Sequence, residues 1–426
     1  FGEKLNVVYP HGESPCGYMA MGYSKKNEQP SVVCVTAGCG ATNAVTPCLI
    51  AYQDSVPLFF ISGAVPHKDN VRYLKHTTRT YSGSDCDIID AIKNMTKFSY
   101  ELWNPEELQT VLDKCVWHMT EGRPGPVWLS IPLDVQGMNV PDSLTGWTPD
   151  EDIREITDFP FEKWNASQRP VILVGGGVRN AKMVNALEQF VQTNNIPVVC
   201  SFFGTDLVPE YNVGRVGVIG DRTGNFTVQN SDFLLVLGCR LSKSITGYRS
   251  DWFAREATIF EVNIESGRHL ETFFSMSLPL KDCAEWLQTT RRWKDMWFRE
   301  LPNPDRTDCP YTVLCDFFDV KPDGQNIVAS SGSIYCVAWH MCKVKHGDRF
   351  ITSGHGDMGY ELPCALGVAL KEHSPTWVIV GDGAFQFNVQ ELQTLKSLNL
   401  PVKILYFDNG GYGAIQITQD LSLIHI

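Results

Sequence analysis

Short runs of β-branched residues alternate with helix-length segments along almost the whole chain. Such runs are Ser31–Val35, Leu58–Ile61, Val127–Ile131, "PVILVGGG", "IPVVCSFFG", "DFLLVLGCR", "TIFEVNI", "NIVAS", "TWVIVGDG" and "VKILYFDNGG". Strands that are separated by helices typically form parallel sheets with helices on both faces. The alternation therefore predicts an α/β protein built from doubly wound parallel sheets.

Two Pro- and acid-containing stretches divide this alternation into three blocks. They are "PDSLTGWTPDEDIREITDFP" and "RELPNPDRTDCP". The length of 426 residues fits two or three domains, on a prior of about 150 residues each. We expect domains over residues 1–142, 162–307 and 311–426.

Composition narrows the functional classes. The formal net charge of −12 argues against a general nucleic-acid or anionic-membrane surface, so any bound phosphate needs a local device such as a metal ion. The sequence contains no run of about 18 uncharged apolar residues, so we expect no membrane span. The fourteen cysteines follow neither zinc-site nor disulfide spacing, and no signal or transit peptide is recognisable. We therefore expect mostly buried thiols and a cytoplasmic location.

Asp382 and Asn409 follow two neighbouring strand-like runs. The run Val378–Val380 ends at Asp382, a helical segment with Asn388 as its expected cap comes next, and the strand Val402–Phe407 leads to Asn409. A right-handed β-α-β crossover makes the two strands parallel and places both carboxyl ends at one edge of the sheet. We therefore expect Asp382 and Asn409 to lie close together.

A carboxylate, an amide oxygen and a backbone carbonyl such as that of Gly411 are hard ligands. Mg²⁺ prefers such ligands when phosphate oxygens complete its octahedron. Gly410 and Gly411 would let the backbone approach the ion. The alternative is two ordinary turns, Asp-Gly and Asn-Gly, which either motif alone would favour.

At this spacing, "GDGAFQFNVQELQTLKSLNLPVKILYFDNGGYG" resembles the thiamine-diphosphate fingerprint of the acetolactate synthase branch of that enzyme family. The resemblance implies that Asp382, Asn409 and the Gly411 carbonyl hold Mg²⁺ on the cofactor diphosphate. The family usually has Asn-Asn where this chain has Asp408-Asn409, but the ligand position is retained. The cofactor-binding residues implied in this motif are Gly381, Asp382, Gly383, Asn409 and Gly411.

The stretch "NVVYPHGESPCGYMAMGYSK" resembles the family's glutamate-helix-Gly-Tyr motif. We expect a strand over Leu5–Tyr9, then Glu13, with Pro15 in the first helical turn and Tyr23 ten residues after Glu13. The resemblance implies that Glu13 bonds to N1′ of the aminopyrimidine, so that the 4′-imino group removes the thiazolium C2 proton and forms the ylid. Alone, Glu13 would be an ordinary solvated acid.

One further stretch of the first block resembles the family, and two positions in this block bear on the acceptor. "TAGCGATNAVTPCLIAYQDSVPLFFISG" resembles the family's Gly-x-Gly-Ala-Thr-Asn loop, in which Gly38–Gly40 would bring backbone against the active site. The alternative is a tight strand-to-helix turn with Asn43 as a cap. Family members often have glutamines near the positions of Ser84 and Ala64, so these departures leave the acceptor preference open.

In the third block, "SGHGDMGYELPCALGVAL" resembles the family's Gly-x-Met-Gly-x-x-Leu-Pro segment. The resemblance implies that the Gly356 carbonyl accepts from the 4′-amino group and that Met358 holds the cofactor in its bent conformation, a role that suits a thioether. Simple core packing is the alternative for Met358. Gly332 and Ser333 stand where the family has a diphosphate loop, although Ser333-Ile334 replaces its usual polar pair.

The middle block carries "PVILVGGGVRNAKMV" and "LLVLGCRLSKSITGY", which resemble the central domain of acetolactate synthases. Some relatives bind FAD there without using it for redox chemistry. The glycine run lacks the G-x-G-x-x-G order and the acid of a dinucleotide site, so the sequence leaves FAD open. The positions to watch are Gly175, Gly176, Arg240, Thr246 and Gly247.

The resemblance reaches about Gln419, and its blocks have the order pyrimidine-binding, central and diphosphate-binding domain. The opening Phe1 and the closing "LSLIHI" suggest a fragment that lacks the N-terminus and the end of the last domain. The implied activity is decarboxylation of a 2-oxo acid, with pyruvate expected, and transfer of the acyl unit to a carbonyl acceptor. Because Glu13 and Asp382 fall in different domains, which come from different subunits in the family, we expect a homodimer or homotetramer.

Four alternatives stay open. The acceptor is a nucleotide-linked ketosugar in sugar-branching relatives. Simple 2-oxo acid decarboxylases use an adjacent His-His pair, which this chain lacks; His11 and His355 lie nearest the motifs and fit structural hydrogen bonding. A non-catalytic paralogue would be expected to lose Glu13 first. A nicotinamide oxidoreductase would need the missing dinucleotide fingerprint.

Overall fold

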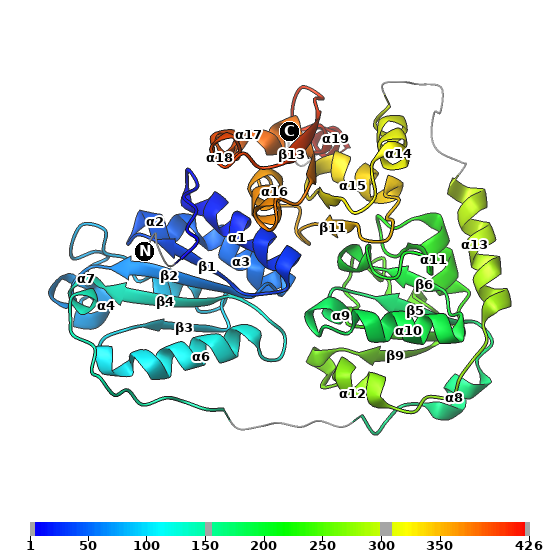
Figure 1. The fold of residues 1–426 in the computed structure, drawn as a ribbon, viewed down its shortest axis with the longest axis horizontal. Helices are drawn as coiled ribbons and strands as arrows, with labels where there is room; N and C mark the ends of the chain where they lie inside the picture. Colours follow the sequence, from blue (N-terminus) through cyan, green and yellow to red (C-terminus); the bar gives the residue numbers. More distant parts are fainter. Residues whose placement is uncertain (1–4, 150–155, 299–308, 422–426) are drawn as a thin grey trace. The chain divides into compact units, whose positions relative to one another are not determined.

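The computed structural model describes residues 5–149, 156–298 and 309–421. The chain forms two compact units (Figure 1). One unit comprises residues 1–151, 328–331 and 353–426, and the other comprises residues 152–327 and 332–352. No helix in the described ranges is long and apolar enough to cross a membrane.

The N-terminal part of the first unit is a four-stranded parallel sheet of order β1-β2-β4-β3. Its strands are β1 (Ser31–Val35), β2 (Leu58–Ala64), β3 (Phe98–Glu101) and β4 (Val127–Pro132). Its helices are α1 (Glu13–Asn27), α2 (Cys39–Asn43), α3 (Val45–Asp54), α4 (Val71–Leu74), α5 (Ile88–Ile92), α6 (Leu108–Thr120) and α7 (Leu133–Gln136). The predicted strands at β1, β2 and β4 are confirmed.

The strand expected over Leu5–Tyr9 is wrong. These residues have no regular secondary structure, and the side chains that should have faced a core are exposed, by 57% for Leu5, 44% for Val7 and 80% for Tyr9. An alternating pattern fixes a strand only when one of its faces is buried. In this segment Val8 alone among the apolar residues is partly buried, against the core that contains Met19 and Leu366, so no alternating face is covered.

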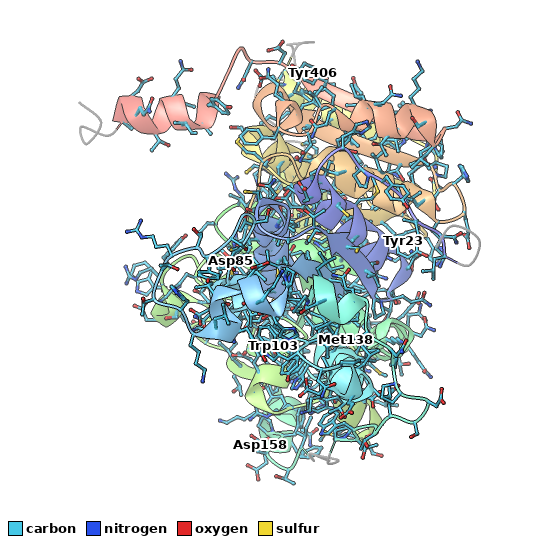
Figure 2. All side chains as sticks on the ribbon, turned by 90° about the vertical axis from the view of Figure 1, so that its left-hand side faces the viewer. Tyr23, Asp85, Trp103, Met138, Asp158 and Tyr406 are labelled. Atoms are coloured by element: carbon cyan, nitrogen blue, oxygen red, sulfur yellow. The ribbon has the colours of Figure 1, made fainter. Side chains whose placement is uncertain are left out.

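The C-terminal part of the first unit confirms the predicted β-α-β crossover. Strand β12 (Thr376–Gly381) pairs in parallel with β13 (Val402–Phe407), and Gly381 is the register partner of Phe407. The helices of this part are α16 (Glu361–Leu370), α17 (Asp382–Gln386), α18 (Glu391–Ser397) and α19 (Gly413–Leu421). Helix α19 has no buried residue and extends away from the rest of its unit (Figure 2).

The prediction that Asn388 caps the crossover helix is wrong. The residue before α18 is Gln390, and no side chain caps that helix. The Asn388 side chain instead donates from Nδ2 to the Gly359 carbonyl at 2.7 Å. The bond holds the turn before α16. Its two residues are 29 positions apart, so local spacing does not reveal it.

Helices α1 and α16 pack directly against each other within the first unit (Figure 1). A Cβ added to Gly22 would lie 2.0 Å from the Cys364 carbonyl oxygen, and one added to Gly367 would lie 1.9 Å from the Met19 carbonyl oxygen. Glycine at both positions therefore lets the two backbones touch. This contact brings the helix that begins at Glu13 together with the helix that follows Met358.

The second unit contains a five-stranded parallel sheet of order β7-β6-β5-β8-β9. Its strands are β5 (Pro170–Val174), β6 (Val198–Cys200), β7 (Asn212–Arg215), β8 (Phe233–Leu237) and β9 (Thr258–Val262). Ile172 and Val174 join one core, and Val171 and Leu173 join another. Both faces of the sheet are thus covered, as the doubly wound prediction requires.

The helices around this sheet are α8 (Phe161–Ala166), α9 (Gly177–Asn180), α10 (Val184–Asn194), α11 (Arg222–Gln229), α12 (Leu270–Ser275) and α13 (Ala284–Phe298). The chain continues through α14 (Pro310–Val320), β10 (Asn326–Val328), α15 (Gly332–Met341) and β11 (Arg349–Ile351). The molecule therefore has three domains with parallel sheets and helices, as the alternation of runs predicts. Strands β3, β7 and β11 were not expected, because polar or charged residues break their short apolar runs, which read "FSYE", "NVGR" and "RFI".

Candidate active site

The crossover brings Asp382, Asn409 and Gly411 together. Asp382 is the first residue of α17, directly after β12, and Asn409 follows β13. One atom of the Asn409 side-chain amide lies 2.6 Å from the Gly411 carbonyl oxygen and 3.1 Å from Asp382 Oδ1. The three groups that were predicted to bind the same metal ion therefore lie close together.

The chemical identity of that amide atom decides what the point can hold. If it is the oxygen, three acceptor oxygens face one another and a cation stabilises them; if the amide is turned by 180°, its nitrogen donates to both neighbours. Gly410 and Gly411 have positive φ angles of 76° and 144°, which glycine adopts readily, in the turn whose Gly411 carbonyl joins this cluster. Within the described ranges no three His, Cys, Asp or Glu side chains gather as a metal site, so a cation here needs the amide and the carbonyl.

Met358 lies against the Gly-Asp-Gly motif. A Cβ added to Gly383 would be 3.2 Å from Met358 Cε and 2.8 Å from a ring carbon of Tyr412. Gly356 has a φ of 66°, and a Cβ added to it would lie 3.8 Å from the Ser330 carbonyl oxygen. The structure thus places the Gly356–Met358 turn beside the motif that contains Asp382.

Glu13 begins α1 and faces the Gly-x-Gly loop. Its Oε2 accepts from Asn43 Nδ2 at 3.2 Å, and its Oε1 is 3.3 Å from where a Cβ on Gly40 would be. The loop therefore lies beside Glu13, while its place at the active site stays a prediction. Asn43 as a helix cap is wrong, because α3 has no side-chain cap and the Asn43 amide serves Glu13 instead.

The segment before Glu13 is tied to α18. The His11 backbone N–H donates to Glu391 Oε1 at 2.9 Å, and the His11 ring Nδ1 lies 3.0 Å from Thr394 Oγ1. Thr394 in turn donates to Glu391 Oε2 at 2.7 Å, and the Glu391 side chain is fully buried. His11 therefore makes the structural hydrogen bonds expected of it, whereas Glu391 and Thr394 were not foreseen from the sequence.

The buried acid Glu361 and the partly buried acid Asp357 flank Met358 and were also missed. Glu361 Oε1 accepts from the Ser331 backbone N–H at 2.8 Å and from its hydroxyl at 2.6 Å, while Oε2 has no hydrogen-bond partner in the described chain. Burial raises the pKa of Glu361 to about 7 and raises the pKa of Asp357, which accepts from Ser353. Both acids are visible in the sequence beside Met358, but no local signal shows that protein atoms enclose them.

Ser84 and Ala64 occupy two different settings. Ser84 has a φ of 66°, and its carbonyl oxygen lies 2.9 Å from where a Cβ on Gly38 would be. Ser84 therefore contacts one end of the Gly38–Gly40 loop, and Glu13 lies beside the other end at Gly40. Ala64 ends β2.

Gly332 and Ser333 begin α15 in the second unit, where Gly332 has a φ of 72°. Their role in binding diphosphate remains a prediction. It rests on the resemblance of the loop alone.

The glycine run after β5 is used for packing. The Gly175 N–H donates to the Leu237 carbonyl at 3.0 Å and the Gly177 N–H to the Gly238 carbonyl at 2.9 Å. A Cβ on Gly176 would lie 2.9 Å from Phe203 Cβ. Arg240 is exposed, Thr246 is buried, and Gly247 has a φ of 66° with open space around it. The two donated N–H groups are not free to bind a phosphate.

Comparison with protein families gives three matches in the order of the predicted blocks. Residues 2–85 match the N-terminal TPP binding domain of thiamine pyrophosphate enzymes. Residues 161–285 match the central domain of these enzymes, and residues 330–423 match their C-terminal TPP binding domain.

Curated relatives are similar over nearly the whole chain. The mitochondrial acetolactate synthase catalytic subunit of Saccharomyces cerevisiae is 28% identical, over 99% of this chain and 68% of its own length. The acetolactate synthase large subunit of Buchnera aphidicola is 28% identical, over 96% of this chain and 76% of its own. The isozyme 2 large subunit of Escherichia coli is 28% identical, over 96% and 77%. The chain thus spans about two thirds to three quarters of these relatives.

Proposed function

Because the chain belongs to the thiamine pyrophosphate enzymes, as an acetolactate synthase-like decarboxylase and carboligase, we propose that pyruvate is its 2-oxo acid donor and that a second 2-oxo acid is its acceptor. The observation that carries this proposal is the convergence of Asp382, Asn409 and the Gly411 carbonyl. It supports a site in which a metal clamps a diphosphate. Pyruvate itself is suggested by the relatives, which are acetolactate synthases by name.

The convergence fits Mg²⁺ as the cofactor's counter-ion. A carboxylate, an amide oxygen and a carbonyl oxygen offer three hard ligands, and phosphate oxygens or water would complete the shell. Asp382 is 8% exposed, so its carboxylate lies out of bulk water, where a divalent charge would stabilise it. In this proposal the three groups fix the diphosphate end of the cofactor.

Glu13 is proposed as the catalytic acid and base at the other end. When bound, the thiazolium ring supplies the electron sink for decarboxylation. Glu13 holds and exchanges a proton with the pyrimidine nitrogen, while Asn43 orients its Oε2. The Gly40 position leaves room beside Oε1, since any Cβ there would lie 3.3 Å away. The His11 tether to Glu391 keeps the start of α1 in place.

Release of acetolactate from pyruvate tests the proposal directly. Full-length protein is incubated with pyruvate, thiamine diphosphate and Mg²⁺, and acetolactate is measured alongside CO₂. Exchange of the C2 proton of bound cofactor provides a second readout that does not depend on the acceptor. CO₂ release with acetaldehyde as the only product would instead indicate a simple decarboxylase. The absence of accelerated C2 exchange would indicate a non-catalytic paralogue.

A nucleotide-linked ketosugar is retained as a second candidate acceptor. Ser84 and Ala64 stand where the family often has glutamines, and Ser84 contacts Gly38 of the loop that faces Glu13. A changed acceptor subsite would therefore lie next to the catalytic acid. CO₂ release from pyruvate that rises on adding such a sugar, without acetolactate, would favour this acceptor.

Three further features belong to the proposal. We propose a homodimer or homotetramer, which sedimentation of the full-length protein tests. FAD at Gly175, Gly176, Arg240, Thr246 and Gly247 is proposed as a non-redox ligand, which flavin absorbance of purified protein tests. A cytoplasmic location is supported by fourteen unpaired cysteine thiols, and fractionation must separate it from the organelles named for some relatives.

A further inference from the structure

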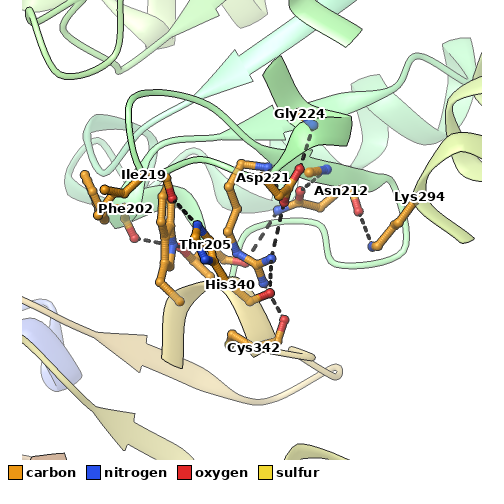
Figure 3. Close-up of polar contacts among 12 residues, drawn as sticks. Phe202, Thr205, Asn212, Ile219, Asp221, Gly224, Lys294, His340 and Cys342 are labelled. Carbon is orange, nitrogen blue, oxygen red and sulfur yellow. Dashed lines mark hydrogen bonds and ion pairs between the residues drawn. The ribbon is translucent and has the colours of Figure 1, made fainter. Parts of the chain in front are cut away.

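The second unit contains a cavity that neither the sequence motifs nor the proposed activity uses. Its volume is about 380 Å³, which falls in the range of small-molecule sites. It is lined by the edge strand β7, the start of α11, the end of α13, the start of α14 and the end of α15. Figure 3 shows the polar contacts around it, with Lys294, Asn212, Asp221 and His340 labelled.

Positive charge dominates the lining of this cavity. The four cations are Arg215, Arg222, Lys294 and Lys343, and the single lining carboxylate is Asp221. Asp221 is already engaged, since it accepts from the Gly224 N–H at 2.6 Å and from the Arg215 N–H at 2.9 Å (Figure 3). Two of these cations have carboxylate partners, since Arg215 pairs with Asp221 and Lys343 pairs with Asp319. In a chain of net charge −12, an anion in the cavity would therefore compensate the charge of Lys294 above all.

Lys294 is the clearest sign of the excess. Its ammonium donates to the Asn212 carbonyl at 2.7 Å (Figure 3), and within the described ranges it forms no ion pair. Its side chain is solvent-exposed, yet surrounding protein atoms lower its pKa and the nearby Arg215 charge lowers it further. A lysine that is crowded by protein but reachable by solvent lies at an open cavity, where a bound anion would compensate its charge.

Aromatic rings form another part of the wall. Trp297, Tyr311 and His340 line the cavity, and the Tyr311 and His340 rings are nearly parallel, with an angle of 23°. The Arg222 guanidinium lies 6.0 Å from the Trp297 ring centre. Aromatic faces next to cations suit a ligand that has a planar ring at one end and a negative group at the other.

We propose that this cavity binds a small phosphate ester that carries a planar ring, of which a mononucleotide is the simplest example. Lys294 and Arg222 contact the phosphate, and Trp297 and Tyr311 contact the ring. The site is separate from the proposed thiamine diphosphate site, because it shares no residue with it. Its occupancy therefore tests neither Glu13 nor Asp382.

Calorimetric titration of the full-length holoenzyme, saturated with thiamine diphosphate and Mg²⁺, tests the proposal. AMP is the probe, and adenosine, ribose 5-phosphate and inorganic phosphate report the separate parts. We expect AMP to bind at least tenfold more tightly than adenosine or inorganic phosphate. Binding should weaken with added salt, as an ion-pair contribution requires.

Variants decide whether any AMP binding occurs at this cavity. Lys294→Met should weaken AMP binding at least tenfold, whereas Lys163→Met, an exposed lysine of α8 outside the cavity, should leave it unchanged. Trp297→Leu should weaken AMP but not inorganic phosphate. Circular dichroism melting of each variant checks folding, and Arg222→Gln replaces Lys294→Met if the latter unfolds. The proposal is overturned if AMP does not bind, or if Lys294→Met and Lys163→Met bind AMP with equal affinity.

Discussion

Two regions of the molecule carry opposite electrostatic imbalances. In the first unit, Asp382 Oδ1, the Asn409 amide and the Gly411 carbonyl converge as acceptors, and only a cation or a turned amide balances them. In the second unit, four cations line a cavity, and two of them pair with the carboxylates of Asp221 and Asp319, whereas Lys294 forms no ion pair within the described ranges. The comparison teaches that the sign of the groups that converge at a site indicates the sign of the ligand that the site suits. In our proposals, the first region binds a metal and the second binds an anion.

The two regions also differ in how they are assembled. A single β-α-β crossover builds the first, so Gly381 and Phe407 become register partners and their strands end together. Five segments between Thr205 and Val344 build the second. The first site could therefore be read from spacing, and the second could not.

Glu13→Gln should give the largest effect and isolates catalysis from cofactor anchoring. Losing the acid removes proton exchange at the pyrimidine, which typically costs about 10²- to 10⁴-fold in rate. The affinity for thiamine diphosphate should change far less, because the metal cluster is intact. The rate of C2 proton exchange and the cofactor dissociation constant are measured side by side. Unchanged exchange would show that Glu13 is an ordinary solvated acid.

Asp382→Asn tests whether the converging oxygens of Asp382, Asn409 and Gly411 bind a cation. Replacing the carboxylate by an amide removes one negative ligand, so Mg²⁺-dependent cofactor binding should weaken by about 100-fold, in the range for lost charge-assisted contacts. The melting temperature without cofactor should not fall, because the new amide can donate to the neighbouring oxygens. Titration with and without Mg²⁺ measures the first effect, and calorimetry measures the second. If cofactor binding depended equally on Mg²⁺ in Asp382→Asn and in the natural protein, Asp382 would not be a metal ligand, and the contrast between the two regions would not hold.

The strand ends explain how much of this site could be read from the sequence. Runs of apolar residues located β12 and β13, and the handedness of crossovers then placed Asp382 beside Asn409. Side-chain partners from distant segments were not readable in the same way. The Asn388 amide holds Gly359, and His11 meets Glu391 from 380 positions away. Such contacts depend on how helices pack, which local spacing does not encode.

Burial was the second quantity that the sequence did not provide. Glu361 stands in the first turn of α16, where an acid is ordinarily favourable and exposed. It is 1% exposed instead, because α16 packs between α1 and the sheet of β12. Leu5–Tyr9 shows the reverse error, since an apolar alternation remained exposed.

Glu361→Gln should change how stability depends on pH. Burial raises the pKa of Glu361 in the folded protein from its ordinary value of 4.5 to about 7, so the folded state retains a proton that the unfolded state releases. The stabilisation is complete below pH 4.5 and is lost as pH rises through 7, with an upper limit of about 3 kcal/mol. The variant should therefore lose less stability than the natural protein between pH 5 and pH 8. Other charged groups near this position are Asp357, Lys25 and Asp54.

Urea unfolding at a series of pH values measures this difference. Glu106→Gln is the matched control, because Glu106 is an exposed acid. It should follow the pH profile of the natural protein. A Glu361→Gln profile that is parallel to the control would mean that Glu361 is ionised in the folded protein and that its unpartnered oxygen is served by another donor.

Asn43→Ala should give the smallest effect, because it removes a neighbour of the catalytic acid and leaves the acid in place. The bond from Asn43 Nδ2 to Glu13 Oε2 is 3.2 Å long and exposed, and a hydrogen bond to a charged group contributes about 1.5 to 3 kcal/mol at most. Solvent access reduces this, so we expect C2 proton exchange to slow by about threefold to tenfold, with unchanged Mg²⁺ dependence. Asn43→Ala combined with Glu13→Gln should be no slower than Glu13→Gln alone, since the amide acts only through Glu13. A further loss in the double variant would show that Asn43 contacts substrate or cofactor directly.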